Sequence, residues 1–370
     1  MMSSSAHPAR PQRRRRSSRA SGSDCISNRG RGRKRGGLAS GFSPSMDFNP
    51  SVSSLDPSSS SLFPDPAETF GDELPLPKPP SVTRIAFQNC GPQPQFSNNA
   101  KSHQLADAFV SGQYDIFLFA EHGLYPPSLQ SGQSWHDQLS LGNKKKTYFV
   151  VGYNRHERHQ TSWHRIGGCA ITVSSPFRDR KVDSGWDLHG LGRWCWFRFF
   201  RKGGGFTRVI SAYFPCSNDT TEGTAWRQQL RHFRNSGVPG DPCDLFINHF
   251  LTEVQSWLDV GDHLVLGIDA NSDVRHGKLR HCLADHGLFE TICSHHMPTP
   301  PPTYNRNKQG TVIDGIFCTP DIEIQQCGFL PFDSPLGAFS DHRLLWVDIT
   351  NASFVGDRQV SECSSFPSRL

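Results

Sequence analysis

Ser340, Asp341 and His342 bring a carboxylate and an imidazole together near the C-terminal end of the chain. A segment rich in Gly, Pro and Phe precedes them and the apolar run 344–347 follows, so we expect a loop at the entrance of a strand that starts near residue 343. Adjacent residues of an extended segment point to opposite sides, which would let Asp341 face a metal ion and His342 a phosphate. A capped turn without a catalytic role accounts for the same tripeptide. The other polar residues of the chain must therefore show whether Asp341 and His342 belong to an active site.

Polar side chains also follow apolar stretches elsewhere in the chain. They are Asn89, Glu121, Tyr213, Asp269 and Asn271. Acids, amides, a phenol and an imidazole that gather at strand ends would form a site rich in oxygen donors. Such a donor set suits a hard cation, Mg²⁺ or Mn²⁺, and not zinc.

Asp314 lies inside the apolar stretch 312–317. A carboxylate in a buried strand costs free energy unless it is paired. We therefore expect Asp314 to have a partner, and a nearby imidazole would serve.

Strands and helices that would position these residues follow one another along the middle of the chain. Short alternating or continuous apolar stretches predict strands, and apolar residues spaced by three and four predict helices. The expected strands are 82–87, 115–120, 148–151, 169–173, 193–199, 208–213, 263–268, 312–318, 322–329 and 343–349, and the expected helices cover 105–110, 226–233, 246–258 and 278–286. Many strands with a few helices and no internal repeat indicate an α+β fold, in which two packed sheets carry helices on their outer faces.

The folded domain is expected at 81–350, between two polar tails. Residues 1–80 are dominated by Ser, Pro, Arg and Gly and read as disordered, and residues 351–370 read as a short tail. Residues 1–40 hold eleven Arg and Lys against one acid, a net charge of +10, and since the whole chain carries +5 the remainder carries −5. Contact between the folded body and nucleic acid would therefore need a local basic patch.

Two basic clusters, 13–16 and 31–35, indicate a nuclear localisation signal or a nucleic-acid-binding arm, although a solvated tail without function has the same composition. An Arg-rich, acid-poor start also resembles a transit peptide, so a mitochondrial or other organelle location is the alternative to a nuclear one. The eleven cysteines are odd in number and form no C-x-x-C pair, which favours reduced thiols inside the cell. No apolar run has the length of a membrane span, and we expect no membrane partner.

The order of seven short segments resembles the endonuclease/exonuclease/phosphatase family, which includes apurinic endonucleases of the exonuclease III type, pancreatic deoxyribonuclease and the endonuclease domains of LINE-type retrotransposons. The matching segments are Phe87-Gln88-Asn89, Phe119-Ala120-Glu121, Gly167-Gly168-Cys169-Ala170-Ile171, Ala212-Tyr213-Phe214-Pro215, Asp269-Ala270-Asn271, Thr303 with Ile313-Asp314, and Ser340-Asp341-His342. Each segment alone is weak evidence, and their order over most of the domain makes the resemblance specific. It implies a four-layered α/β sandwich of two packed mixed β-sheets flanked by helices, with the active site at one rim.

The resemblance also implies a role for each matching residue. The expected metal-binding residues are Glu121, Asn89 and Asp341. The expected catalytic residues are His342 at the scissile phosphate, Asp314 as the residue that orients it, Asp269 at the attacking water, and Asn271 and Tyr213 at the phosphate or beside Asp269.

Four positions depart from the family's usual pattern. Ile268 stands where Gly usually precedes the Asp of the Asp-x-Asn motif, and Gly267 comes one residue earlier. Cys216 stands where the family usually has Asn, and His122 stands where it often has Thr. Gly315 stands where the family commonly has Tyr. None of these changes removes a charged catalytic group, so they indicate a divergent branch whose substrate class is open.

The loop that contains Arg155 and Arg165 is expected to lie near the active site in this fold. These two residues are therefore predicted to bind the phosphates of the substrate. The His residues of the same loop, which include a His-x-x-His pair at 156–159, are read as part of a solvated loop and not as a metal site.

Together these residues predict a Mg²⁺- or Mn²⁺-dependent phosphodiesterase that hydrolyses the nucleic-acid backbone. We expect a monomeric DNA endonuclease of the apurinic or retrotransposon type, with DNA favoured over RNA. A phosphatase or lipid phosphodiesterase of the same fold is one alternative. A catalytically silent nucleic-acid-binding remnant of a mobile element is another.

Overall fold

The computed structural model describes residues 68–91, 100–123, 148–156, 166–217, 223–296, 299–306 and 310–357. The predicted basic clusters, most of the N-terminal tail, Arg165 and residues 358–370 lie outside these ranges. Among the described helices, none has both the length and the apolar character needed to cross a membrane.

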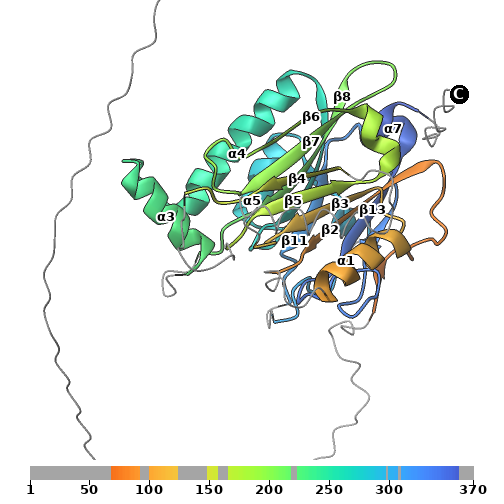
Figure 1. Cartoon of the computed structure of the whole chain (residues 1–370), viewed down its shortest axis with the longest axis horizontal. Helices are drawn as coiled ribbons and strands as arrows, with labels where there is room; N and C mark the ends of the chain where they lie inside the picture. Colours follow the sequence, from red (N-terminus) through yellow and green to blue (C-terminus); the bar gives the residue numbers. More distant parts are fainter. Residues whose placement is uncertain are drawn as a thin grey trace, which may run out of the picture. The chain divides into compact units, whose positions relative to one another are not determined.

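Two mixed β-sheets form the centre of the domain (Figure 1). The first has the strand order β1-β12-β13-β2-β3-β5-β4 and the second β10-β11-β9-β8-β7-β6. The strands of the first sheet are β1 Phe70–Gly71, β2 Val82–Asn89, β3 Ile116–Ala120, β4 Tyr148–Gly152, β5 Cys169–Val173, β12 Ile324–Phe329 and β13 Leu345–Thr350. The strands of the second sheet are β6 Lys181–Trp186, β7 Trp194–Phe200, β8 Phe206–Tyr213, β9 Asp262–Asp269, β10 Phe289–Glu290 and β11 Asp314–Cys318.

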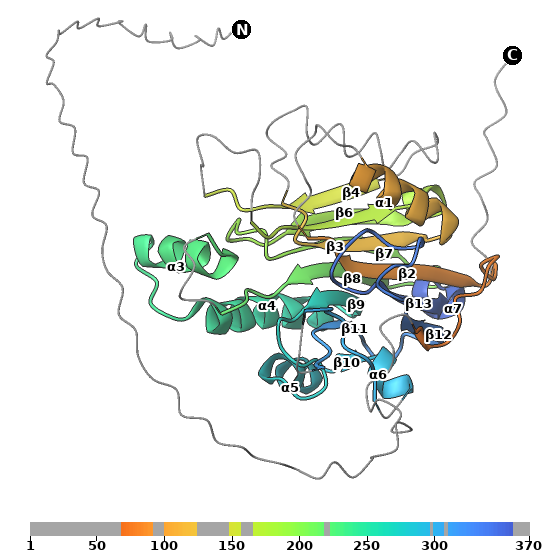
Figure 2. The ribbon, with the colours of Figure 1, turned by 90° about the horizontal axis from the view of Figure 1, so that it is seen from below.

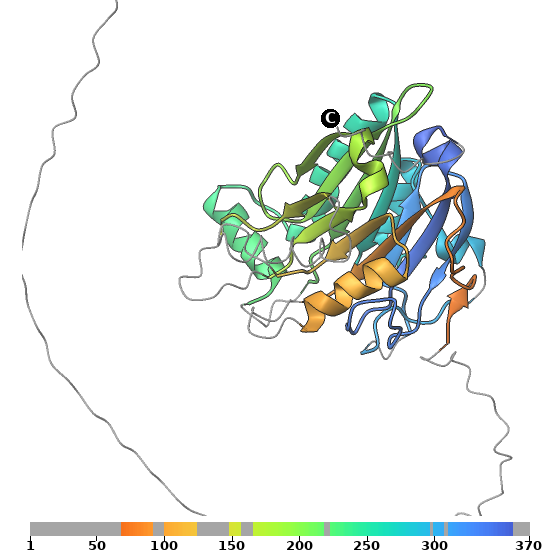
Figure 3. The same cartoon turned by 45° about the vertical axis from the view of Figure 1, so that its right-hand side comes forward.

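Helices cover the outer face of each sheet. They are α1 Ala100–Ser111, α3 Ala225–Asn235, α4 Pro242–Asp259, α5 Lys278–Asp285, α6 Ile292–His295 and α7 Asn351–Val355, with a 3-10 helix at Ser175–Arg180. The orange helix α1 lies over the first sheet in Figure 3. Its Leu105 and Phe109 belong to one apolar cluster with Phe117 and Phe119 of that sheet. On the second sheet, the rings of Phe246 and Phe250 in α4 lie 5.4 and 5.1 Å from the ring of Trp194.

The two sheets bury their inner faces against each other. Phe87 and Leu118 of the first sheet belong to the same apolar core as Ile210 and Leu266 of the second. Gly267 allows close approach of the two layers, because a Cβ there would lie 2.6 Å from the ring of Phe87. Helix, sheet, sheet and helix follow one another in Figure 2, which confirms the predicted four-layered sandwich.

Strand register aligns the polar residues at one end of the central strands in each sheet. In the first sheet β2 and β3 are parallel and Asn89 pairs with Ala120, so that Glu121 follows directly beyond the pair. In the second sheet Asp269 of β9 pairs with Tyr213 on the parallel strand β8 and with Asp314 on the antiparallel strand β11. The fold therefore aligns residues that lie far apart in the sequence.

The folded region extends beyond the predicted limits 81–350. At the N-terminal end β1 pairs with β12, and the ring of Phe70 lies 5.2 Å from that of Phe329. The Pro-rich segment 75–80 therefore connects two strands instead of closing a tail. At the other end α7 follows β13 directly, and its Phe354 is fully buried.

Candidate active site

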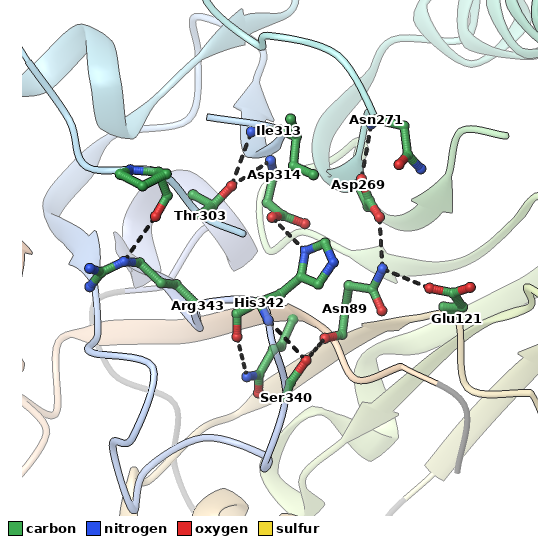
Figure 4. A network of polar contacts seen from close by, with 12 residues as sticks. Asn89, Glu121, Asp269, Asn271, Thr303, Ile313, Asp314, Ser340, His342 and Arg343 are labelled. Carbon is green, nitrogen blue, oxygen red and sulfur yellow. Dashed lines mark hydrogen bonds and ion pairs between the residues drawn. The ribbon is translucent and has the colours of Figure 1, made fainter. Parts of the chain in front are cut away.

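Asn89 connects carboxylates from both sheets. Its Nδ2 donates to Oδ2 of Asp269 at 2.7 Å and to Oε2 of Glu121 at 3.2 Å (Figure 4). Its Oδ1 accepts a hydrogen bond from the backbone N–H of Gly91 at 2.8 Å. This geometry orients the two carboxylates through the amide N–H. The predicted role of Asn89 as a metal ligand stays a prediction.

Asp269 and Glu121 are fixed by further contacts from the second sheet. Oδ1 of Asp269 accepts a hydrogen bond from the backbone N–H of Asn271 at 2.9 Å, and the Asn271 side chain donates to the carbonyl of Phe214 at 2.8 Å. The hydroxyl of Tyr213 lies 3.4 Å from Oε1 of Glu121. The structure thus gathers the predicted residues Glu121, Asp269, Asn271 and Tyr213 around Asn89.

His342 and Asp314 form the contact that the sequence suggested. Nδ1 of His342 lies 2.8 Å from Oδ2 of Asp314, and both side chains are buried. The other ring nitrogen, Nε2, makes no hydrogen bond to any residue of the described chain. The tautomer and the orientation of the ring are therefore set from one side, which leaves Nε2 available to a substrate.

Hydroxyl groups hold the two segments that carry His342 and Asp314. Oγ of Ser340 donates to the carbonyl of Asn89 at 2.6 Å and accepts from the backbone N–H of His342 at 3.1 Å. Oγ1 of Thr303 accepts from the backbone N–H groups of Ile313 and Asp314, both at 3.0 Å. The capped turn is therefore present, and it positions the imidazole.

Glu121 and Asn271 have left-handed backbone conformations, with φ of 56° and 44°. Such values are uncommon for residues with a Cβ and are often found at functional sites. At Glu121 the backbone N–H donates to the carbonyl of Gly168 at 2.7 Å. This bond to the residue just before β5 holds the backbone of Glu121 at the end of β3.

Burial and mutual repulsion dominate the electrostatics of these groups. Burial raises the pKa of Glu121, and burial together with the charge of Asp314 raises the pKa of Asp269 to about 7. Burial alone would lower the pKa of His342, but the adjacent Asp314 outweighs it and raises that pKa to about 9. The region therefore holds more carboxylates than positive charges.

This excess of negative charge fits a divalent cation. Glu121 has only neutral hydrogen-bond partners in the described chain, and Oδ1 of Asp314 is buried without a partner among the described residues. Asp341 is partly exposed, lies 3.2 Å from Arg306 and is close enough for its charge to raise the pKa of Glu121. At this site Asp269, Asp314 and His342 offer ligand atoms that all lie within 4.8 Å of one another. The predicted binding of a hard cation such as Mg²⁺ by Glu121 and Asp341 stays a prediction.

Sequence comparison finds no relative of this chain, whereas structural comparison finds similar solved structures. No protein-family model and no curated protein sequence matches the chain. Among solved structures, the human Nocturnin catalytic domain with bound sulfate is 14% identical over 79% of this chain and 99% of that domain, with a TM-score of 0.52. The Xenopus laevis APE2 catalytic domain is 13% identical over 72% of this chain and 92% of that chain, with a TM-score of 0.50.

This chain has the endonuclease/exonuclease/phosphatase fold. A structure described as an endonuclease/exonuclease/phosphatase family protein from Leptotrichia buccalis is also similar, at 12% identity and a TM-score of 0.46 over 72% of this chain. The predicted family resemblance is confirmed at the level of the fold. The retrotransposon branch stays a prediction.

The departures from the endonuclease/exonuclease/phosphatase pattern leave the strand ends intact. Ile268 pairs with Ala212 and Gly315 inside the second sheet, so β9 runs unbroken to Asp269. Cys216 is exposed as a residue, but its thiol is partly desolvated, and this desolvation together with the charges of Asp269 and Glu121 raises the pKa of the thiol. It therefore lies beside the candidate active site as a neutral thiol.

Of the two predicted phosphate-binding arginines the structure describes only Arg155, and its described contacts are not with this group. The guanidinium of Arg155 lies 4.4 Å from the ring centroid of Trp186, and Arg155 makes no hydrogen bond or ion pair with the candidate active-site residues. Arg165 lies outside the described residues. His156, expected in a solvated loop, packs its ring 4.1 Å from that of His232 in α3, a contact between segments too distant for the sequence to reveal.

Proposed function

We propose that this protein is a divalent-metal-dependent phosphodiesterase that cleaves the DNA backbone as an endonuclease. The observation that supports the proposal most strongly is the convergence of two groups at one rim of the sandwich. One group is the carboxylate pair Glu121 and Asp269, joined by Asn89. The other is the imidazole–carboxylate pair His342 and Asp314. Phosphodiester hydrolysis needs charge neutralisation and a positioned nucleophile, and these two groups offer both.

Glu121 and Asp341 would hold the cation. When bound, Mg²⁺ or Mn²⁺ supplies Lewis-acid stabilisation of the charge that develops on the phosphate. Tyr213 and Asn89 keep the Glu121 carboxylate in position through their O–H and N–H groups. Asn89 thus contributes to the reaction by orienting the Glu121 carboxylate.

His342 would act on the phosphate through Nε2. Because Nδ1 faces Asp314, a protonated ring carries its second N–H at Nε2 and can donate it to a phosphate oxygen. The negative charge of Asp314 stabilises this imidazolium. The pair therefore offers a positive hydrogen-bond donor at the scissile group.

Asp269 would act on the attacking water. Both of its oxygens are held by N–H donors, from Asn89 and from Asn271, so its orientation is fixed before a substrate arrives. Each oxygen keeps a further lone pair that can accept a proton from water. A base whose orientation is fixed in this way loses little free energy of reorganisation when the substrate binds.

The basic N-terminal clusters support a nucleic-acid substrate and a nuclear location. Their eight Arg and Lys residues attract phosphates without regard to sequence. Imaging of a fluorescent fusion, with and without Gln at 13–16 and 31–35, tests the location. Retention in the nucleus after the changes, or a mitochondrial signal before them, would contradict it.

Nicking assays test the activity. We expect purified protein to cleave supercoiled plasmid or a duplex with one abasic site when Mg²⁺ is present. EDTA, Glu121→Gln and His342→Asn should each abolish cleavage, and His281→Asn, a change of an exposed His in α5, should not. DNA binding without cleavage under every divalent cation would favour the silent binding module. Phosphate release from inositol phosphates with no action on DNA or RNA would favour the phosphatase.

A further inference from the structure

A second group of metal-binding side chains lies away from the candidate active site. Asp72, His296 and Cys327 each offer one ligand atom, and these atoms all lie within 4.8 Å of one another. They come from the residue after β1, from the C-terminal end of α6 and from β12. Strand pairing aligns Cys327, through β13, with Ile85 in the middle of β2, whereas Asn89 ends that strand. We propose that Asp72, His296 and Cys327 bind a Zn²⁺ ion, at a site separate from the one that the proposed function requires.

The donor set of this group favours zinc over the hard cations. A cysteine thiolate, an imidazole and a carboxylate are the ligand types that zinc takes in proteins. Mg²⁺ and Ca²⁺ are bound through oxygen, whereas the soft thiolate selects zinc and similar metals. The group therefore differs in chemistry from the oxygen-rich candidate active site.

The spacing of the ligand atoms fits a tetrahedral ion. Oδ2 of Asp72 lies 3.4 Å from Nε2 of His296. Two zinc bonds of about 2.1 Å at the tetrahedral angle place their ligand atoms about 3.4 Å apart. The zinc–sulfur bond is longer, about 2.3 Å, so Sγ of Cys327 belongs farther from the other two atoms. Three protein ligands leave the fourth position to water, which can enter because Asp72 and His296 are partly exposed.

Contacts with the backbone hold the three residues in place. The N–H of Cys327 donates to Oδ2 of Asp72 at 2.9 Å, and the N–H of Asp72 donates to the carbonyl of Cys327 at 3.0 Å. Nε2 of His296 donates to the same carbonyl at 3.0 Å. Gly71 permits this approach, because a Cβ there would lie 2.6 Å from that carbonyl oxygen and 2.9 Å from Cδ2 of His296. Zinc binding would then require only that the ring proton move to Nδ1, where a metal-bound imidazole carries it.

The thiol of Cys327 must lose its proton to bind zinc. Cys327 is fully buried, and this burial together with the charge of Asp72 raises the pKa of its thiol. A coordinated metal ion reverses this effect, because it deprotonates the thiol that binds it. The thiolate and the Asp72 carboxylate would then balance the two positive charges of Zn²⁺.

Zinc at this position would fasten β1 to the domain. β1 is two residues long and lies at the edge of the first sheet, next to β12. Helix α6 lies beside β12, as Figure 2 shows. An ion with ligands from these three places would therefore connect the end of β1 to both neighbours.

Spectroscopy with Co²⁺ tests the ligands directly. Full-length protein, reduced and treated with a chelator, is titrated in excess Mg²⁺, which competes for sites made of oxygen donors. Co²⁺ should give a thiolate-to-metal charge-transfer band in the near ultraviolet, and added Zn²⁺ should remove the band by displacing Co²⁺. Cys327→Ser should lose the band. Cys216→Ser, which changes the exposed cysteine beside the candidate active site, should keep it.

Changes of the two partly exposed ligands give a second test that does not depend on the folding of Cys327→Ser. His296→Gln and Asp72→Asn should each weaken Zn²⁺ binding, measured by competition with a chromophoric chelator. The loss should exceed the roughly 10- to 100-fold that changes outside a ligand set typically cost. The matched controls, His295→Gln and Glu73→Gln, change exposed neighbours and should bind Zn²⁺ like wild type.

Three results would each overturn the inference. They are the absence of Zn²⁺ binding in excess Mg²⁺, a charge-transfer band that survives Cys327→Ser, and equal loss of affinity in the ligand variants and their controls. None of them bears on the proposed function, because the nicking assay with Mg²⁺ tests that separately. Absence of DNA cleavage would likewise leave the zinc site intact.

Discussion

Oδ2 of Asp314 lies 2.8 Å from Nδ1 of His342. The two residues come from β11 and from the loop before β13, which lie in different sheets. Their contact explains why an acid occupies an otherwise apolar strand, since the carboxylate fixes the ring that faces the rim. It also joins the two layers at the point where the phosphate would bind.

Asp314→Asn should remove the negative charge of this pair while keeping its size and shape. The amide keeps the volume of the carboxylate but cannot stabilise an imidazolium, so the pKa of His342 should fall from about 9 toward its ordinary value. Cleavage should fall by roughly 10²- to 10³-fold. NMR titration of the imidazole and single-turnover rates measure the two effects, with exposed Asp333→Asn as control. An unchanged pKa would show that Asp314 does not set the charge of His342.

Glu121→Gln should abolish cleavage and raise the stability of the metal-free protein. Removal of one carboxylate from an over-charged region should raise the stability of metal-free protein by about 1 kcal/mol, because burial disfavours the charged form. Wild-type protein should be stabilised by Mg²⁺, by about 2.7 kcal/mol at a hundred times its dissociation constant, and the variant should not. Thermal denaturation with and without Mg²⁺ measures both. Equal stabilisation of the two proteins by Mg²⁺ would place the cation elsewhere.

Arg84 and Asp348 form a fully buried ion pair between β2 and β13, with Nη2 2.7 Å from Oδ2. Arg84→Met should lower the free energy of unfolding by about 3–5 kcal/mol, because it leaves a buried charge alone. The double change with Asp348→Leu should recover most of this loss. Arg180→Met, in a partly exposed pair with Asp357, should cost less than about 1 kcal/mol. Similar losses for both single changes in denaturant titrations would contradict this interpretation.

Histidines around α3 should make the protein sensitive to mild acid. Burial and the nearby Arg193 lower the pKa of His249 to about 4, and burial also lowers the pKa of His189, which stacks on it at 3.9 Å. A lowered His pKa stabilises the fold above pH 6.5, and this contribution is lost as pH falls toward 4. Asp187 faces the same cluster and limits the effect.

His249→Gln should therefore flatten the loss of stability between pH 6.5 and 4. The expected difference is about 1 kcal/mol or less, because the ring is partly exposed to solvent. Melting temperatures of both proteins across this range give the comparison. A steeper loss in the variant would reverse the assigned sign.

The sequence predicted the positions of the catalytic groups better than their contacts. Asp269 and Tyr213 were recognised because each ends an apolar strand, and Asp314 because it is a carboxylate inside an apolar stretch. Strand register then aligns the three residues. That Asn89 orients Glu121 and Asp269 through its N–H depends on the distance between two sheets, which no local pattern encodes. The left-handed conformation of Glu121 likewise accompanies a backbone hydrogen bond to Gly168, the residue before β5, which lies far away in the sequence.

The N-terminal limit of the domain was misjudged for a similar reason. Phe70 and Gly71 lie in a polar, Pro-rich context that is typical of disorder, and only pairing with β12 makes them a strand. The same holds for His156, whose packing on His232 joins a loop to a helix that the sequence treats separately. Tertiary contact decides the structure of short segments with weak local preference.

Cleavage of an end-labelled duplex under single-turnover conditions tests the proposed chemistry most directly. Wild-type protein with Mg²⁺ should cut the backbone, and either EDTA or His342→Asn should lower the rate by at least about 10²-fold without loss of DNA binding. Cleavage by His342→Asn at the wild-type rate, or by wild-type protein in EDTA, would contradict the assignment of the metal and His342 to the reaction.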